Sequence, residues 1–151
     1  MKPRLMLLIA CLAMAGIALG ADRTEAARMI DRYASSHGAE VTVIKGGDLS
    51  RYSISEYHSL TLPSADAATA DAIAAAVGTD MASAADREVS YHDGRIKYAF
   101  LTLPPDEAGL NRYVIYVCNP AQNGRRRVVL IDIKGKATAR QLQNLIKITS
   151  K

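Results

Sequence analysis

Several residue types that usually build protein cores are scarce in this sequence. It has no tryptophan, one phenylalanine and two cysteines among 151 residues. Seven tyrosines therefore supply nearly all of the aromatic side chains, and many of the hydrophobic residues are alanines. A chain of this length forms one domain. Its core is expected to be small and built largely from aliphatic side chains and tyrosines.

Cysteine is too scarce for a fold that depends on disulfides. Cys11 lies in the first apolar stretch, so the rest of the chain contains only Cys118, which cannot form an internal disulfide. Cys118 ends the run YVIYVC, which is typical of a buried strand in which cysteine acts as a small hydrophobic residue. Neither a helix N-terminus nor a basic activator lies near it in the sequence. We therefore expect Cys118 to be structural and unreactive.

Familiar catalytic and metal-binding motifs are also missing. No histidine has a second His or Cys at ligand spacing; the three are His37, His58 and His92. G-x-S-x-G is absent, and no glycine-rich loop follows a strand and opens a helix. Asp106-Glu107, and Glu56 with Asp132, are too generic to indicate acid–base catalysis. We therefore assign no catalytic residue, metal or cofactor, and expect no enzymatic activity.

The first twenty residues have the features of a secretory signal peptide. A basic start precedes an uncharged apolar run, which ends at the small residues Ala18 and Gly20 of a cleavage site. The run is too short and wrongly flanked for a membrane span. We expect residues 1–20 to be the signal peptide and residues 21–151 to be one domain. Export would place that domain in the periplasm or cell envelope, with no transmembrane span after processing.

A second processing site competes with cleavage near Ala21. Residues 8–10 followed by Cys11 fit a bacterial lipoprotein signal, in which Cys11 would carry a lipid anchor. Only six apolar residues precede Cys11, whereas the apolar region of a signal peptide usually has roughly 7–15. The apolar run also continues well beyond Cys11. The lipid anchor is therefore the weaker alternative.

The remaining charge is small, with one dense basic run. Without Lys2 and Arg4 the chain has 17 basic and 15 acidic residues, a net charge of +2. This argues against nucleic-acid binding by bulk electrostatics. Arg125, Arg126 and Arg127 follow a predicted turn. Three arginines can grip phosphate or sulfate groups, although such a run more often forms a solvated turn that protects a strand end from aggregation.

Hydrophobic periodicity and turn residues predict three helices and six strands. Helices are expected over 22–36, 65–77 and 139–148, and strands over 40–45, 51–62, 87–92, 95–103, 112–118 and 127–134. Asp93-Gly94 is the strongest hairpin signal. Pro63 should end a strand, Ser64 should cap the middle, Ala-rich helix, and Gly78 should interrupt it. The order αββαββββα, linked by hairpins, predicts an α+β fold with a mostly antiparallel sheet of about five to six strands.

The predicted strands suggest one core face and one binding face. Alternation places Ile96, Tyr98, Phe100, Val129, Ile131 and Ile133 on a sheet face packed under helices. In a regular strand over 51–62, the opposite side from Ile54 and Leu60 would carry Ser53, Ser55, Tyr57, Ser59 and Thr61. Such a row of hydroxyls suits an uncharged glycan or a wet protein interface, although an ordinary solvated face is the simpler interpretation. These five residues and Arg125, Arg126 and Arg127 are the candidate binding residues.

The assembled features resemble a known kind of protein. A signal peptide, a short amphipathic helix, hairpin pairs around an alanine-bearing helix, and the segments RYVIYV and VVLIDIKGKATARQLQNLI resemble small exported domains of unknown function common in Bacteroidetes. In those domains a final strand ending in glycine leads into a short C-terminal helix, here over residues 128–148. The resemblance implies export and the fold class. It brings no established activity, so no functional residue is transferred from it.

These observations favour a non-catalytic binding module of the cell envelope whose partner is an envelope protein or a glycan. The alternative is a small envelope hydrolase that uses His58 or His92 with a nearby carboxylate. The two histidines could also approach each other across strands. A concave pocket around either histidine would favour the enzyme, and a flat, open sheet face would favour the binding module.

Overall fold

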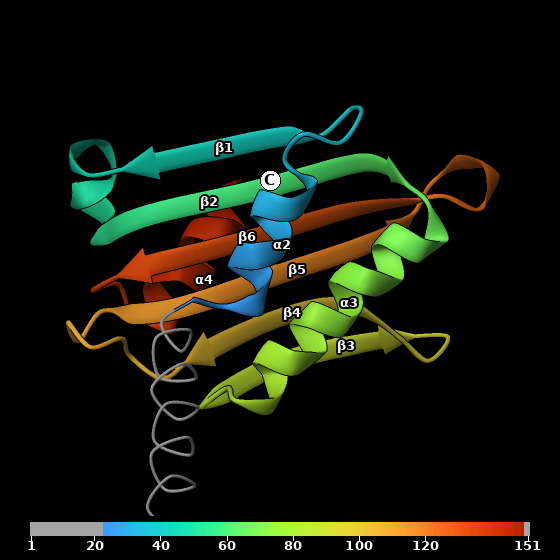
Figure 1. Ribbon diagram of the computed structural model, residues 1–151. Helices are drawn as coiled ribbons and strands as arrows, with labels where there is room; N and C mark the ends of the chain where they lie inside the picture. Colours follow the sequence, from blue (N-terminus) through green and yellow to red (C-terminus); the bar gives the residue numbers. More distant parts are fainter. Residues whose placement is uncertain (1–22, 150–151) are drawn as a thin grey trace, which may run out of the picture.

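A six-stranded antiparallel sheet organises residues 23–149, the part of the chain that the computed structural model describes (Figure 1). The strands are β1 (Glu40–Lys45), β2 (Ile54–Ala65), β3 (Asp86–His92), β4 (Arg95–Leu103), β5 (Asn111–Pro120) and β6 (Arg126–Gly135). The helices are α2 (Glu25–Tyr33), α3 (Ala67–Ala82) and α4 (Ala139–Thr149), with short 3-10 helices η1 (Gly47–Tyr52) and η2 (Gln122–Gly124). The predicted α+β class and the order αββαββββα are confirmed. The predicted signal peptide, Cys11 and the predicted cleavage site lie outside the described residues.

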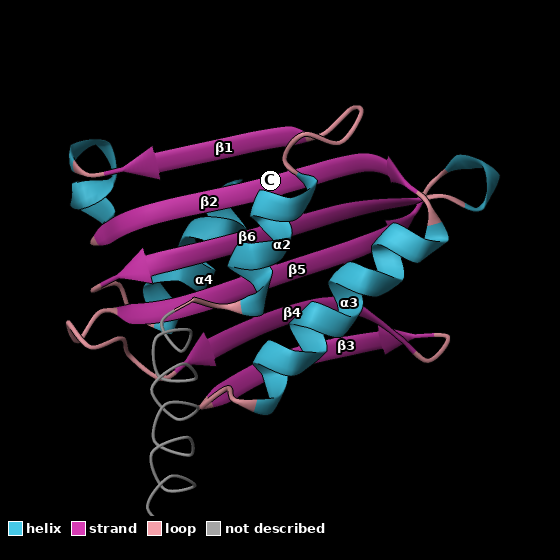
Figure 2. Cartoon of the chain, in the orientation of Figure 1, coloured by secondary structure: helices cyan, strands magenta, loops and turns pink. Residues whose placement is uncertain are grey.

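The strand order brings the two halves of the chain together. It runs β1-β2-β6-β5-β4-β3. After β2 the chain passes through α3, over one face of the sheet, to the far edge at β3, and the meander β3-β4-β5-β6 then returns to the side of β2 (Figure 2). Helices α2 and α3 cover one face, and α4 covers the other (Figure 1). Side chains from β2 and β6, far apart in the sequence, therefore meet in the middle of the sheet.

Local side-chain chemistry explains the well-predicted turns and caps. Asp93 and Gly94 both have positive φ, 50° and 76°, as a two-residue hairpin between twisted strands requires. At the start of α4, the N–H of Gln141 donates to Thr138 Oγ1 at 3.2 Å, and the N–H of Thr138 donates to Gln141 Oε1 at 2.8 Å. This reciprocal pair is a capping box.

The prediction that Pro63 ends a strand is wrong. Strand β2 continues through it to Ala65, with a register shift against β6 between Leu62 and Ala65. Because proline has no N–H to donate, it is tolerated at such an irregularity, where a ladder hydrogen bond is already missing. The longer strand carries the chain to the point where α3 begins.

The expected boundaries of the middle helix also need correction. The residue that caps α3 is Asp66 and not Ser64: the N–H of Thr69 donates to Asp66 Oδ1 at 2.7 Å. Gly78 lies inside α3 and does not interrupt it. A single glycine costs only about 1 kcal/mol in a helix, and the packing of α3 on the sheet outweighs this. The 3-10 helix η1 was not predicted.

Two hydrophobic cores lie on the two faces of the sheet. The core under α2 and α3 includes Ile30, Leu60, Ile73, Leu101, Val114, Tyr116 and Leu130. The core under α4 includes Ile54, Phe100, Tyr113, Ile115, Ile133 and Leu142. In the second core, the hydroxyl of Tyr113 donates to the carbonyl of Ala137 at 2.6 Å, which joins the strand to the turn before α4. Within residues 23–149, no helix is long and apolar enough to cross a membrane.

The predicted core face is correct only in part. Tyr98, Phe100, Ile131 and Ile133 pack in or against the α4 core, as expected for one face. Ile96 packs against the opposite core. The ladder with β3 pairs Tyr98 with Ser90 and Ile96 with Tyr91, so Lys97 is an extra residue on β4. A bulge of this kind reverses the alternation of side chains, which moves Ile96 to the other face. Val129 is half-buried.

Candidate functional site

Two hollows lie on the sheet face that carries α2 and α3. The larger, which we name the basic groove, has a volume of about 880 Å³ and lies between the first half of α3, the β3–β4 hairpin and the loop after β5. The smaller, which we name the polar pocket, has a volume of about 320 Å³ and lies beside the N-terminus of α2. The residues that line the two hollows belong to opposite ends of the strands, which can be followed from the strand ends in Figure 1.

The basic groove collects positive charge from two separate segments, the β3–β4 hairpin and the β5–β6 connection. The cations that line it are Arg95, Lys97, Arg125 and Arg126, and the carboxylates are Asp71 and Asp93. With its histidine neutral, the lining has a net charge of +2. Its floor is largely apolar and includes Ala74, Ala75, Ile96, Tyr116, Cys118 and Pro120. The combination of a basic rim and an apolar floor suits an anionic ligand that also has apolar surface.

A single carboxylate holds two of these arginines. Asp71 Oδ1 is 3.3 Å from Arg126 Nη1 and 3.8 Å from Arg95 Nη1. The side chain of Asp71 is more than half exposed, so these ion pairs are screened and weak. Arg125 is held differently: its Nε and Nη2 donate to the carbonyl of Ser64 at 3.0 and 2.9 Å. Arg125 therefore ties the β5–β6 loop to the end of β2.

Cys118 lies in the floor of the basic groove. It is half-buried and packs against the core under α2 and α3. Beside it, the ring of Tyr116 is buried, and burial raises the pKa of that phenol. The unreactive character expected of Cys118 stays a prediction.

The polar pocket is built from two rows of side chains that cross the sheet. In the outer row, Lys45 pairs with Glu56, Glu56 with Lys134, and Lys134 with Arg112, each on a neighbouring strand. In the inner row, His58 on β2 pairs with Asp132 on β6. The next row inward, which includes Leu60 and Leu130, already belongs to the core. The polar pocket therefore lies directly beyond the apolar sheet residues that α2 covers.

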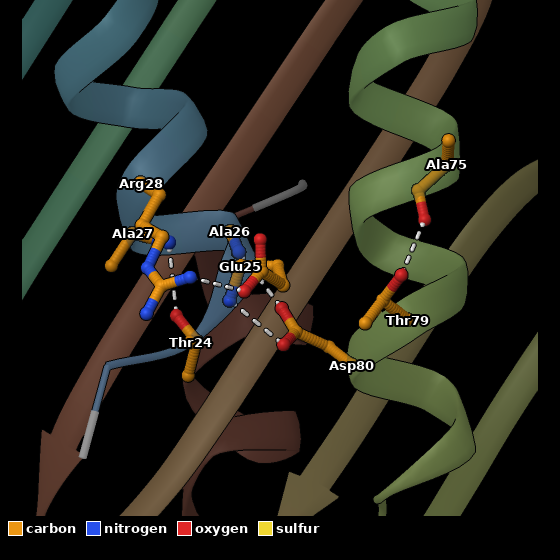
Figure 3. A network of polar contacts seen from close by, with 8 residues as sticks. All are labelled: Thr24, Glu25, Ala26, Ala27, Arg28, Ala75, Thr79 and Asp80. Carbon is orange, nitrogen blue, oxygen red and sulfur yellow. Dashed lines mark hydrogen bonds and ion pairs between the residues drawn. The ribbon is translucent and has the colours of Figure 1, made fainter. Parts of the chain in front are cut away.

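Helix α2 forms one wall of the polar pocket and is fixed at its N-terminus. Thr24 Oγ1 donates to Asp132 Oδ1 at 2.9 Å and accepts from the N–H of Ala27 at 2.9 Å. From α3, Asp80 accepts the N–H groups of Glu25 and Ala26, one on each oxygen, both at 2.8 Å (Figure 3). The backbone N–H groups in the first turn of α2 are thus paired with acceptors from its own N-cap and from α3.

Burial changes the proton affinity of these carboxyls. Loss of water raises the pKa of Asp80, and this effect outweighs the two backbone N–H groups that favour its ionised form. Burial also raises the pKa of Asp132, and this effect outweighs the hydrogen bond from Thr24 and the neighbouring basic groups of His58, Lys134 and Arg112. Perturbed carboxyls beside a cleft are candidates for a functional site.

Most other charges at the polar pocket already have partners. His58 Nε2 is 3.4 Å from Glu56 Oε2. Lys134 Nζ is 3.3 Å from Asp106 Oδ2, and Arg23 forms an ion pair with Asp31. The pocket lining has four cations, Arg23, Lys45, Arg112 and Lys134, and three carboxylates, Asp31, Glu56 and Asp132. With His58 neutral, it is therefore close to electrically balanced.

Comparison with known proteins identifies the family but assigns no activity. Residues 14–146 match the model of a family of unknown function, DUF6108. The chain belongs to this family. No curated protein and no solved structure matches the chain. For this DUF6108 member, the arguments about function therefore come from the geometry of the two hollows.

The structure places the predicted arginines on two sides of the sheet. Arg125 and Arg126 line the basic groove. Arg127 follows Arg126 on β6 and is exposed; alternation directs it away from the groove. Arg95 and Lys97 complete the groove and were not predicted. Their position directly after the Asp93-Gly94 turn places them on a returning hairpin, but nothing local in the sequence places that hairpin beside β5.

The predicted hydroxyl row is not continuous, because β2 is irregular where it begins. Ser53 precedes β2 with a left-handed backbone, φ 60°. A register shift follows between Ile54 and Glu56. As a result, Ile54 and Tyr57 both belong to the core region under α4, which regular alternation would forbid. Ser53 and Ser55 instead line a third, shallower hollow with Gly46 and Lys136.

The rest of the row lies on the α4 face. Tyr57 packs partly against the α4 core and is therefore not a freely solvated side chain. Ser59 and Thr61 are half-buried, at alternate positions after Tyr57. Binding by these hydroxyls stays a prediction, but the structure does not align all five for one ligand.

The three histidines lie apart. His58 lies in the polar pocket, and His92 lies at the rim of the basic groove, 3.3 Å from Asp93. They cannot approach across strands, because β2 and β3 are not neighbours in the sheet. His37 is exposed in the loop after α2. Among residues 23–149, no three His, Cys, Asp or Glu side chains lie close enough to hold a metal ion.

Proposed function

We propose that this DUF6108 member is an exported, non-catalytic binding module of the cell envelope whose basic groove binds an acidic glycan. The observation that carries this proposal is the convergence of Arg95, Lys97, Arg125 and Arg126 on one hollow. The planar guanidinium group matches carboxylate and sulfate oxygens with two parallel hydrogen bonds. A glycan also has apolar ring faces, which the floor of the groove can cover.

The shape and the ion pairs of the groove support ligand binding. Its volume of about 880 Å³ lies within the range of ligand sites, roughly 300–1,000 Å³. Asp71 Oδ1 lies within ion-pair distance of both Arg95 and Arg126, so the two guanidinium groups face the same part of the groove. Because these pairs are exposed, an incoming anion can compete with Asp71 at low cost.

Retention on heparin–agarose tests the proposal, with heparin as a sulfated glycan probe. The double variant Arg95→Gln/Arg126→Gln should elute at clearly lower salt than the wild type. Loss of two exposed charge pairs, about 0.5–1 kcal/mol each, corresponds to roughly five- to thirty-fold weaker binding to a heparin oligosaccharide by calorimetry. Arg127→Gln is the matched control, since Arg127 is exposed but points away from the groove. An equal shift per charge in the control would show bulk attraction only and would overturn the proposal.

Export rests on the signal-peptide features of residues 1–20. Expression of the full chain in a secreting bacterium, followed by mass spectrometry of the protein from the envelope fraction, tests it. The expected N-terminus lies within a few residues of Ala21. Recovery of the intact chain from the cytoplasm, or of a chain that begins with acylated Cys11, would contradict this expectation.

The alternative function is a small hydrolase that acts through His58. In its favour, the polar pocket brings His58 together with Glu56 and Asp132. Against it, the one hydroxyl in the pocket lining belongs to Thr24, and its oxygen already bonds Asp132 and Ala27. Chromogenic ester and glycoside substrates separate the two functions. Turnover by the wild type that is lost in His58→Ala would establish the enzyme and reject the non-catalytic module.

A further inference from the structure

We propose that the polar pocket is a second ligand site, which takes a small zwitterion of amino-acid size. The amino group of the ligand would lie between Asp132 and Glu56, and its carboxylate would face Lys45. The site is independent of the basic groove, which lies at the other end of the strands.

The positions of the two rows set the polarity of the site. Glu56 and Asp132 are diagonal neighbours on β2 and β6, because Glu56 pairs with Lys134 and His58 pairs with Asp132. Diagonal side chains on neighbouring strands are roughly 7 Å apart, so one ammonium group can lie between the two carboxylates. The cations of the outer row lie on either side, Lys45 on β1 and Arg112 on β5.

The charge balance of the pocket favours a zwitterion over an ion of either sign. With four cations and three carboxylates in the lining, the pocket attracts neither strong anions nor strong cations, in contrast to the basic groove. Lys134 and Arg23 are engaged by Asp106 and Asp31. Lys45 is exposed and makes no ion pair with any residue in the described part of the chain. A ligand carboxylate beside Lys45 would give this side chain an ion-pair partner.

Asp132 forms the floor of the site. One of its oxygens accepts the hydroxyl of Thr24, and burial raises the pKa of this carboxyl. Burial therefore disfavours the ionised form of Asp132 more than the neighbouring His58, Lys134 and Arg112 favour it. A ligand ammonium would add an opposite charge directly at this half-buried carboxyl, where an ion pair is stronger than at an exposed surface.

Titration of the purified protein with glycine, glycylglycine and L-glutamine, followed by amide NMR spectra, tests the proposal. At least one zwitterion should give saturable shifts at His58, Asp132 and their neighbours. Methylamine and acetate, which carry the two charges separately, should bind at least ten-fold more weakly. Absence of saturable shifts with all three zwitterions, or equal binding of methylamine or acetate, would overturn the proposal.

Substitutions then test the assigned orientation. Asp132→Asn and Lys45→Gln should each weaken binding of the best zwitterion by at least five-fold. The matched controls Asp86→Asn and Lys136→Gln change exposed residues outside the pocket and should leave it unchanged. Lys45 is exposed, so its variant keeps the test valid if Asp132→Asn fails to fold. Equal effects of Lys45→Gln and its control Lys136→Gln would overturn the proposal. The groove variant Arg95→Gln/Arg126→Gln should weaken heparin binding and leave zwitterion binding unchanged.

Discussion

Replacement of Asp80 should destabilise the protein although this residue lies outside both hollows. Asp80 is 4% exposed, and its two oxygens accept the N–H groups of Glu25 and Ala26 at 2.8 Å (Figure 3). The first N–H groups of a helix have no partner within the helix. In Asp80→Ala both donors lose their acceptor in a buried place. The contact between the start of α2 and the middle of the sheet should therefore loosen.

The magnitude follows from the bonds that are lost. A hydrogen bond to a charged group contributes about 1.5–3 kcal/mol, and a carboxylate at a helix N-terminus contributes about 0.3–2 kcal/mol more. The burial of the charge, which raises the pKa of Asp80, offsets part of this. We expect Asp80→Ala to lower the free energy of unfolding by about 2–4 kcal/mol. Asp80→Asn should cost about half as much, because the amide oxygen still accepts one N–H.

Urea unfolding at pH 7 measures this effect, with tyrosine fluorescence as the signal because the chain has no tryptophan. With a slope of about 2 kcal/mol per molar urea, in the middle of the usual range for small proteins, the midpoint of Asp80→Ala should fall by roughly 1–2 M. Thr79→Ala is the matched control: Thr79 is the neighbouring residue, and its exposed hydroxyl donates only to Ala75 of the same helix, at 3.2 Å. It should change stability by less than about 0.5 kcal/mol. An equally small effect of Asp80→Ala would refute the role of this cap.

The same carboxyl should make stability depend on pH with a definite sign. Its pKa is higher in the folded than in the unfolded protein, where an aspartate titrates near about 4. Its contribution is therefore complete below about pH 4 and is lost as the pH rises through the folded pKa. Asp80→Asn removes this contribution, so the stability difference from the wild type should be larger at pH 4 than at pH 7. A difference that grows with pH would show that the shift has the opposite sign.

Three further changes have expected outcomes. Phe100→Ala should cost about 3–5 kcal/mol in a urea titration, because Phe100 is 2% exposed in the α4 core; a loss near zero would place it outside that core. Gly135→Ala should cost about 1–3 kcal/mol, since a Cβ would clash with the carbonyl oxygen of Ser53, and unchanged stability would show that the backbone around Ser53 can move aside. Cys118 should react slowly with a thiol reagent at neutral pH, whereas rapid labelling of the folded protein would show a reactive thiol.

Elements whose ends depend on neighbouring residues could be predicted from the sequence. The strand Arg95–Leu103 has the expected limits because Asp93-Gly94 accepts positive φ and the run alternates until it reaches a proline pair. Helix α4 begins where Thr138 can exchange hydrogen bonds with Gln141. In each case the residues that set the boundary lie within a few positions of it.

Features that depend on strand pairing could not be predicted in this way. The extra residue at Lys97 and the shift between Ile54 and Glu56 appear only when the partner strands are known. Each one reverses the faces of the residues beyond it. Ile96 therefore packs in the opposite core from the one expected. Likewise, Ser53 is not in line with Tyr57, Ser59 and Thr61, with which it was expected to form one row of hydroxyl groups.

The candidate sites also depend on the order of the strands. Glu56 and Asp132 are distant in the sequence, and they become diagonal neighbours because β6 returns to the side of β2. Many antiparallel orders are compatible with the same pattern of six strands. Similarly, Arg126 and Arg95 share Asp71 as an ion-pair partner because α3 lies over that end of the sheet.

The cap on α2 should link the stability of the protein to the polar pocket. Asp80 holds the first turn of α2, and Thr24, directly before that turn, both bonds Asp132 and lines the pocket. If Asp80→Asn loosens this turn, it should weaken zwitterion binding in the pocket, although Asp80 does not line it. Heparin retention should stay unchanged, because the basic groove contains no residue of α2. NMR titration of Asp80→Asn with the best zwitterion measures this coupling. Unchanged affinity in a destabilised variant would show that α2 acts only as a cover for the core and does not shape the site.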